Sequence, residues 1–268
     1  MINLLDTIKT TISDNHVLPF SVYTSVKEQK LLNVPIVKPL LIVVLSGDKE
    51  IGMDRKEVCH SGSFIFLSDS SAINIRNIPK NKTYFALLIE FDEQDIKGLH
   101  VNTPNKQHYC IGETTPVLER CLQQFVESSL WAPEQLWSSR KREIIELLCH
   151  MGHKEILSMV GNSTVGRRLN DMFCELDFHE LTIKYICNQL AMSESTLRRK
   201  LKSEGTSVQE IKDQARLGKG LHLLQTTRYS VGLIAEKCGY QSQSRFADRF
   251  KGRFGLTPSE LRKTKMAG

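Results

Sequence analysis

Hydrophobic and polar positions follow a strand-like pattern over residues 20–90. Leu40–Leu45 is an apolar run that ends at a Ser-Gly-Asp turn signal, and Phe64–Leu67 follows a Ser-Gly pair. Ala72–Ile78 alternates between apolar and polar residues as a half-buried strand does, and Tyr84–Phe91 is a further strand candidate. Strands at such close spacing predict a small barrel or sandwich.

The spacing of apolar residues becomes helical from about Pro116. The apolar face of this helix comprises Val117, Leu118, Cys121, Leu122 and Phe125. After Pro133 a second helix is predicted, with its own apolar stripe. That stripe comprises Leu136, Ile144, Ile145, Leu147, Leu148 and Met151. The two helices are expected to flank the barrel.

The helical pattern is interrupted at Gly161-Asn162-Ser163, and beyond it the chain is helical with short turns. We therefore predict an α+β protein of two domains. Residues 1–160 would hold the barrel, at about 20–100, and the flanking helices, at about 113–160. Residues 161–268 would form an all-α domain whose first helix lies at about 164–176.

The second domain contains an internal repeat at an offset of about 49 residues. Residues 182–193 match residues 230–242 with one insertion, and each copy leads into a second amphipathic helix. Thr182 and Ser230 are N-cap candidates. Core anchors are expected at Ile183 and Ile186 in the first copy and at Val231 and Ile234 in the second. Turns are expected at Ala191-Met192 and Gly239-Tyr240, with Ser193 and Ser242 capping the helices that follow. Each copy therefore reads as a helix-turn-helix.

The second helix of each copy has a buried side, marked by Leu197 and Leu201 in one and by Phe246 and Phe250 in the other. The opposite sides are available to a DNA groove. On the first helix these positions are Ser195, Arg198, Arg199 and Lys202, and on the second they are Gln243, Ser244, Ala247 and Lys251, flanked by Arg245 and Arg249. A single basic face of this kind is more often a solvated surface. Its occurrence twice, each time behind a matching turn, favours DNA contact.

Residues 207–226 read as one helix between the two copies. At about 1.5 Å per residue, roughly 18 helical residues would cover about 27 Å, a length that could hold two recognition helices about one DNA turn apart. Gly218 and Gly220 should each cost about 1 kcal/mol relative to alanine in a helix interior. We hypothesise that they make this connecting helix less rigid.

The distribution of charge differs between the two predicted domains. The chain has a net charge of +6. Residues 161–268 contain 19 Lys and Arg against 11 Asp and Glu, whereas the first 160 residues contain 17 and 19. Only the second domain is therefore suited to a polyanion, although chance asymmetry on solvated faces is the plain alternative.

The composition argues against several other classes of protein. The seven cysteines are odd in number and include no C-x-x-C pair, which disfavours a disulfide framework and a zinc ribbon. No apolar run approaches the roughly 20 residues of a membrane span, and the N-terminus does not read as a secretory signal. We therefore expect a cytoplasmic location and no membrane association.

The C-terminal sequence resembles the AraC/XylS family of transcription regulators over about residues 164–264. The match is densest in residues 234–262, at Gly239-Tyr240, Phe246, Arg249-Phe250-Lys251 and Thr257-Pro258-Ser259. Leu201, Ala191 and Gly220 depart from the family pattern, where an aromatic residue, glycine and alanine are usual. Asp248 is unusual on a DNA-facing helix and would either accept from cytosine or pair with Arg245.

The N-terminal half more weakly resembles the cupin-like sensor domains of that family, through Pro39–Gly47, Ser61-Gly62 and Tyr84–Ile89. In such proteins the barrel binds a small effector and the adjoining helices often form a homodimer. No pair of histidines with a glutamate stands at cupin metal spacing. His150 and His153, beside Cys149, could hold a metal, but no fourth ligand is evident and a surface or interface pair is the favoured interpretation.

These observations predict a sequence-specific DNA-binding regulator, an activator that responds to a small molecule in the barrel. The expected partners are double-stranded promoter DNA, the effector, a second copy of the chain and RNA polymerase. No catalytic residue, cofactor or metal is predicted. One alternative is an enzyme with a catalytic barrel, but the adjacent Cys59 and His60 would point to opposite faces of a strand. Another is a nonspecific architectural DNA binder.

Overall fold

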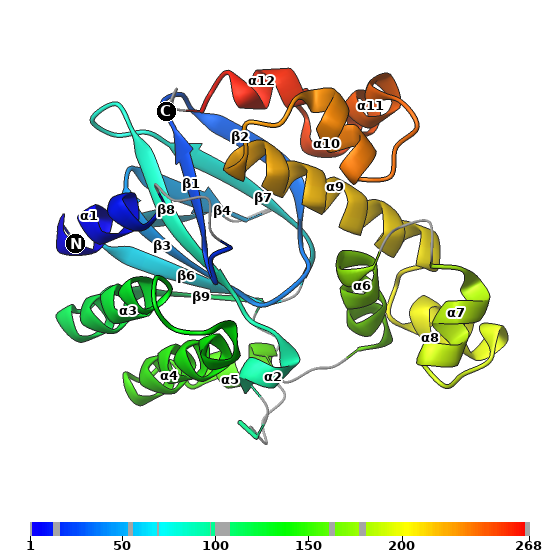
Figure 1. Ribbon diagram of the computed structural model, residues 1–268, viewed down its shortest axis with the longest axis horizontal. Coiled ribbons are helices and arrows are strands. Elements are labelled where there is room, and N and C mark those ends of the chain that lie inside the picture. The colour runs from blue at the N-terminus through cyan, green and yellow to red at the C-terminus, as the bar shows by residue number, and fades with distance from the viewer. Residues whose placement is uncertain are drawn as a thin grey trace.

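The computed structural model describes residues 2–12, 17–52, 56–68, 70–96, 98–99, 108–160, 164–176 and 181–265. A sheet-rich N-terminal region is followed by a helical C-terminal region (Figure 1). This arrangement confirms the predicted α+β fold class. The predicted domain boundary at Gly161-Asn162-Ser163 lies outside the described residues. None of the helices in the described part of the chain has the length and apolarity that a membrane crossing requires.

The N-terminal region contains two antiparallel sheets and several flanking helices. One sheet has the strand order β1-β8-β3-β6-β9 and the other has the order β2-β7-β4-β5. The strands are β1 (Ser21–Ser25), β2 (Gln29–Ile36), β3 (Leu40–Ser46), β4 (Asp48–Ile51), β5 (Glu57–His60), β6 (Ser63–Leu67), β7 (Ser70–Ile78), β8 (Tyr84–Glu90) and β9 (Tyr109–Glu113). The helices are α1 (Ile2–Thr11), α2 (Glu93–Ile96), α3 (Pro116–Ser128), α4 (Trp137–His150) and α5 (Glu155–Val160), with a short 3₁₀ turn at Glu134–Leu136.

Strand β3 shows why the run at Leu40–Ser46 is apolar without alternation. It lies between β8 and β6, and its side chains are buried on both faces of the sheet. Ile42 and Val44 belong to the core between the two sheets, whereas Leu41 and Val43 belong to the core between the five-stranded sheet and the helices α1, α3, α4 and α5. A strand covered on both faces reads as a continuous hydrophobic run.

Two residues predicted to lie on buried helix faces are exposed. Val117 is 63% exposed because it precedes Leu118, which begins the buried stripe of α3, and so lies to one side of that stripe. Leu136 is 48% exposed because it belongs to the 3₁₀ turn before α4 and not to that helix. The remaining predicted members of both stripes are buried or half-buried.

The C-terminal region is entirely helical over its described residues. Its helices are α6 (Val165–Glu175), α7 (Ile183–Gln189), α8 (Glu194–Ser203), α9 (Val208–Thr226), α10 (Val231–Lys237), α11 (Gln243–Phe254) and α12 (Pro258–Arg262). Thr182, Ser193, Ser230 and Ser242 each accept a hydrogen bond from the backbone N–H three residues later, as predicted for N-caps.

The helical region has two cores. The first helix-turn-helix, α7 and α8, packs with α6 and the start of α9 around a core that includes Leu169, Phe173 and Leu197. The second, α10 and α11, packs against the rest of α9 and α12, and its Phe246 and Phe250 belong to the same core as the strands of the two sheets. The second half is therefore docked on the barrel, whereas the first has a core of its own.

Candidate nucleic-acid interface and interior cavity

The turn of each helix-turn-helix is built in the same way. The Met192 N–H donates to the Cys187 carbonyl in the first turn, and the Tyr240 N–H donates to the Ala235 carbonyl in the second. The residue before each donor has a left-handed backbone, with φ of 50° at Ala191 and 72° at Gly239. Glycine adopts this conformation without strain, whereas the Cβ of alanine makes it unfavourable.

The outward face of α8 carries all four residues that the sequence analysis placed there. Ser195, Arg198, Arg199 and Lys202 are exposed, while Leu197 and Leu201 are buried on the opposite face. The four side chains therefore lie on one exposed face of α8, as their helical spacing predicted.

Arg198 has a partner that sequence reasoning missed. Its Nη2 and Nε atoms donate to Oε1 of Glu194, one turn earlier on α8, at 2.6 and 2.9 Å. The pair is exposed, so it is weak and its guanidinium can exchange the carboxylate for a phosphate or a base. The i, i+4 spacing of an acid before an arginine is the signal that could have found it.

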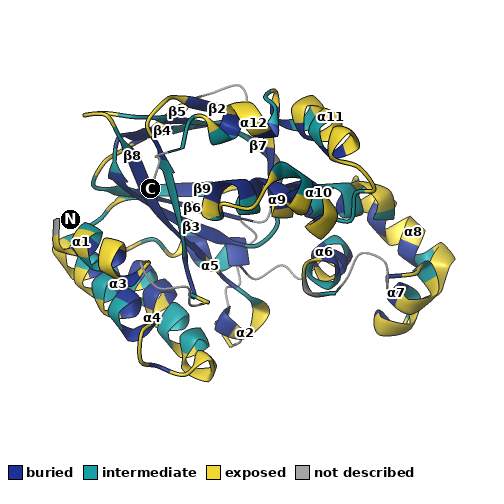
Figure 2. Ribbon diagram, turned by 45° about the horizontal axis from the view of Figure 1, so that its top comes forward, coloured by how far each residue is buried: buried dark blue, intermediate teal, exposed yellow. Residues whose placement is uncertain are grey.

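The outward face of α11 is less charged than that of α8. Gln243, Ser244, Arg245 and Lys251 are exposed as expected, and Ala247 is half-buried. Figure 2 shows exposed residues along the outer sides of both α8 and α11. The two helices lie at separate places along the connecting helix α9 (Figure 1). The structure thus presents two helical surfaces of the size and chemistry that enter a major groove.

Gly220 permits close packing between the connecting helix and the second half. A Cβ at this position would lie 2.7 Å from Cε2 of Phe246, whereas a Cβ at Gly218 would lie 3.4 Å from Cγ of Pro35. Gly220 therefore lets α9 approach the aromatic core of α11. This packing role accounts for a residue that the sequence alone linked only to flexibility.

A cavity of about 260 Å³ lies between the barrel strands and α9. Its apolar lining includes Leu31, Val34, Ile36, Leu40, Ile42, Ile75, Leu88 and Leu221. Its polar lining includes Ser21, Tyr23, Lys38, Lys49, Asn77, Glu90, Lys219 and His222. The wall is shared by both regions of the chain, because Gly218, Lys219 and His222 come from α9. Sequence reasoning assigned no residue to such a site.

Lys49 is an unusual group in this cavity because its side chain is buried. Its Nζ donates to Oδ1 of Asn77 at 2.6 Å and to the hydroxyl of Tyr84 at 3.3 Å. Burial lowers the pKa of Lys49 to about 7. Its protonation is therefore balanced near neutral pH, where an anionic ligand would favour the charged form.

The other polar groups of the cavity connect α9 with the strands. The hydroxyl of Tyr23 on β1 lies 3.3 Å from Nδ1 of His222 on α9. Burial raises the pKa of Tyr23 and lowers that of His222. Lys38 is paired with Asp92, and this hydrogen bond raises the pKa of Lys38 although burial acts in the opposite direction. The cavity therefore combines an apolar interior with several cationic side chains.

The helix-turn-helix domain family matches residues 186–264. The HTH-type transcriptional regulator GadX of Escherichia coli is 26% identical over 213 residues, which are 75% of this chain and 76% of GadX. The urease operon transcriptional activator of Escherichia coli is 38% identical over 77 residues, which are 29% of this chain and 26% of that protein.

Solved structures of ToxT from Vibrio cholerae share the fold of nearly the whole chain. One superimposes with a TM-score of 0.68 at 15% identity, covering 94% of this chain and 100% of that chain. Unsaturated fatty acid bound ToxT superimposes with a TM-score of 0.64 at 15% identity, covering 96% and 98%. The chain therefore contains a helix-turn-helix domain with two capped units, is similar in sequence to HTH-type transcriptional regulators, and shares its fold with ToxT, which supports a DNA-binding transcription regulator that resembles the AraC/XylS family.

Proposed function

We propose that this regulator binds promoter DNA through the outward faces of α8 and α11, and that a small amphipathic acid in the interior cavity controls this binding. The observation that carries the proposal is the shared wall of the cavity. Gly218, Lys219 and His222 of α9 face the same space as the barrel strands. Because α9 connects the two helix-turn-helix units, a ligand in the cavity touches the helix that sets their relative placement.

The proposed DNA contacts divide into two groups. On α8, Arg198, Arg199 and Lys202 would supply charge to phosphates and guanine edges, with Ser195 beside them. On α11 the proposed contacts are Gln243, Ser244, Arg245 and Lys251. A search for preferred sites in a random duplex library, with the full chain, tests sequence-specific binding. Equal affinity for selected and unselected duplexes at fixed salt would instead support a nonspecific architectural binder.

The chemistry of the cavity favours an acid with an apolar tail as the ligand. Aliphatic side chains would surround the tail, and Lys38, Lys49 and Lys219 would attract the carboxylate. ToxT structures described as bound to an unsaturated fatty acid and to a naphthalenyl-butenoic acid are consistent with this class of ligand. On β5, Cys59 is buried and His60 is exposed, so the two side chains do not act as a pair. We therefore propose a sensor and not an enzyme.

Calorimetric titration with oleic acid tests the ligand class. Oleyl alcohol, which has the same tail without the carboxylate, is the matched control. The proposal predicts saturable binding of the acid, binding of the alcohol at least about tenfold weaker, and a change in affinity for a selected duplex when the acid is present. Equal binding of acid and alcohol would contradict the role of the lysines.

The pH dependence of ligand binding tests the role of Lys49. Its pKa of about 7 means that the charged form declines as the pH rises from 6 to 8. If the carboxylate binds only to charged Lys49, its affinity should fall by about tenfold over this range. Titrations at pH 6 and pH 8 check this, and the Lys49→Met variant should bind weakly at both. A wild-type affinity that does not change with pH would contradict the assignment.

We also propose that two copies of the chain associate through the N-terminal helices. Leu130, Trp131 and Leu136 are 52%, 68% and 48% exposed in the connection between α3 and α4, and Val117 at the start of α3 is 63% exposed. Large exposed apolar side chains can mark a protein interface. Sedimentation equilibrium of the wild type and of Trp131→Ser would test this.

We further propose that the protein is located in the cytoplasm and that it contacts RNA polymerase as an activator of transcription.

A further inference from the structure

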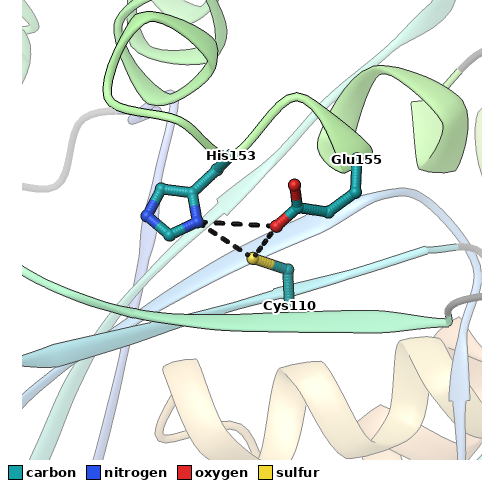
Figure 3. Close-up of side chains that lie close together, drawn as sticks. All are labelled: Cys110, His153 and Glu155. Atoms are coloured by element: carbon teal, nitrogen blue, oxygen red, sulfur yellow. Dashed lines mark hydrogen bonds and ion pairs between the residues drawn. The ribbon is translucent and has the colours of Figure 1, made fainter.

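Cys110, His153 and Glu155 come together outside the proposed DNA-binding faces and the lining of the cavity (Figure 3). Sγ of Cys110 lies 3.4 Å from Nδ1 of His153 and 2.9 Å from Oε1 of Glu155. Nδ1 of His153 lies 3.5 Å from the same carboxylate oxygen. One atom from each of three different side chains therefore points toward a common space.

Of the two histidines considered in the sequence analysis, only His153 belongs to this cluster. His150 is the last residue of α4 and is exposed. His153 follows the end of that helix, so the two histidines do not share one helical face. His153 instead turns toward β9, where Cys110 lies.

The surroundings hold the imidazole of His153 in one orientation. The ring packs edge-on against Phe64, with centroids 5.1 Å apart and an interplanar angle of 83°. Gly112 leaves room for it, because a Cβ there would lie 2.8 Å from Cε1 of His153. Cys110 itself is only 7% exposed. The three groups are thus partly enclosed and positioned by packing, as metal ligands are.

We propose that Cys110, His153 and Glu155 bind one divalent transition-metal ion of the Zn²⁺ class, with water in the fourth position. In a tetrahedral zinc site, bonds of about 2.0–2.3 Å place neighbouring ligand atoms about 3.4–3.6 Å apart. Two of the three observed separations already have this length. The third, between sulfur and carboxylate, must widen by about 0.7 Å when the ion replaces the thiol proton, which passes to solvent.

The position of the site gives the ion a structural effect. It would join β9, at the edge of the five-stranded sheet, to the start of α5. Helix α5 ends at Val160, whose carbonyl accepts a hydrogen bond from Nη1 of Arg167 in α6. A bound ion would therefore fasten the last helix of the N-terminal region, directly before the chain enters the DNA-binding region.

Metal titration of the reduced, chelator-treated full chain tests the proposal. We expect one Zn²⁺ per chain by calorimetry, and Co²⁺ should give a thiolate-to-metal charge-transfer band in the near ultraviolet. Cys110→Ser should abolish that band and weaken Zn²⁺ binding by at least about tenfold. Glu155→Gln should weaken binding but keep the band, since the thiolate remains.

Cys121→Ser and His150→Ala are the matched controls, because they remove the same residue types outside the cluster. Both should bind as the wild type does. Circular dichroism checks that each variant is folded. If Cys110→Ser does not fold, Glu155→Gln provides the test, because its amide oxygen can still accept a hydrogen bond from the thiol. Absence of stoichiometric binding to the wild type would show that the three residues form only a hydrogen-bonded cluster. A cobalt band that persists in Cys110→Ser would place the metal elsewhere, and either result overturns the proposal.

Discussion

The two helix-turn-helix units have the same capped turns but different support. The first, α7 and α8, packs with α6 around a small core that includes Leu197 and Leu201. In the second, Phe246 and Phe250 of α11 join the core of the barrel strands. Hydrogen bonds strengthen this attachment, since Gln225 of α9 donates to Gln29 of β2 at 3.2 Å. The barrel strands therefore support the second unit directly, whereas the first unit is joined to them through its supporting helices α6 and α9, whose Cys174 and His222 line the cavity.

Removal of Phe250 should have the largest effect and should destabilise both the barrel and the second unit. Its side chain is fully buried, and truncation of such a residue costs about 3–5 kcal/mol. Urea unfolding should show Phe250→Ala lowering the free energy of unfolding of both regions together. Leu197→Ala, the control in the first unit, should leave the barrel transition in place. Equal loss of barrel stability in the two variants would contradict the claim that only the second unit shares the core of the barrel.

Alanine at Gly220 should destabilise the protein, whereas alanine at Gly218 should not. At Gly220 the new Cβ meets the ring of Phe246 at 2.7 Å, and overpacking of this kind costs about 1–3 kcal/mol. At Gly218 the nearest atom is 3.4 Å away, so the gain in helix propensity of up to about 1 kcal/mol can prevail. Thermal unfolding of the two single variants measures this difference. Similar melting temperatures would mean that α9 and α11 pack less closely than described.

Alanine substitutions on α8 should separate base readout from phosphate contact. Arg198→Ala should weaken preference at one position of the site by about 1–3 kcal/mol, whereas Lys202→Ala should weaken binding to all sequences and lower the salt slope by about 1. Binding to a selected duplex and its single-base variants, at several salt concentrations, measures both. Identical behaviour of the two variants would contradict the assignment of these side chains.

The smallest expected effect concerns the two turns. Ala191 has φ of 50° where the second unit has Gly239 with φ of 72°. Ala191→Gly should therefore stabilise the first unit by about 0.5–1 kcal/mol, and Gly239→Ala should destabilise the second by at least that amount. Denaturant midpoints of both variants test this. Destabilisation by Ala191→Gly would show that the first turn is not strained.

The helical region was largely predictable because its signals are local. Helix α9 was expected at residues 207–226 and begins at Val208 with Ser207 as its cap, and the four predicted N-caps are all present. Strands β4 and β5 were not singled out, because they are short and β4 begins Asp48-Lys49-Glu50, which reads as a turn. The burial of Lys49 depends on its partner Asn77, 28 residues away.

The cavity and the Cys110 cluster could not be predicted for a related reason. Tyr23 and His222 are 199 residues apart and meet only because α9 docks on β1. Cys110 and Glu155 are 45 residues apart and meet because α5 packs against the sheet edge. By contrast, the faces of α8 and α11 were found from helical spacing alone. Sites made by one helix are visible in a sequence, whereas sites made by docking need the fold.

Amide hydrogen exchange of the full chain tests most directly the claim that the second helix-turn-helix unit shares the core of the barrel, whereas the first has a core of its own. Amides of α11 should exchange as slowly as those of β2, because the two share a core and open together. Amides of α8 should exchange faster, through local opening of the smaller core. Protection of α8 equal to that of α11 and β2 would contradict the account.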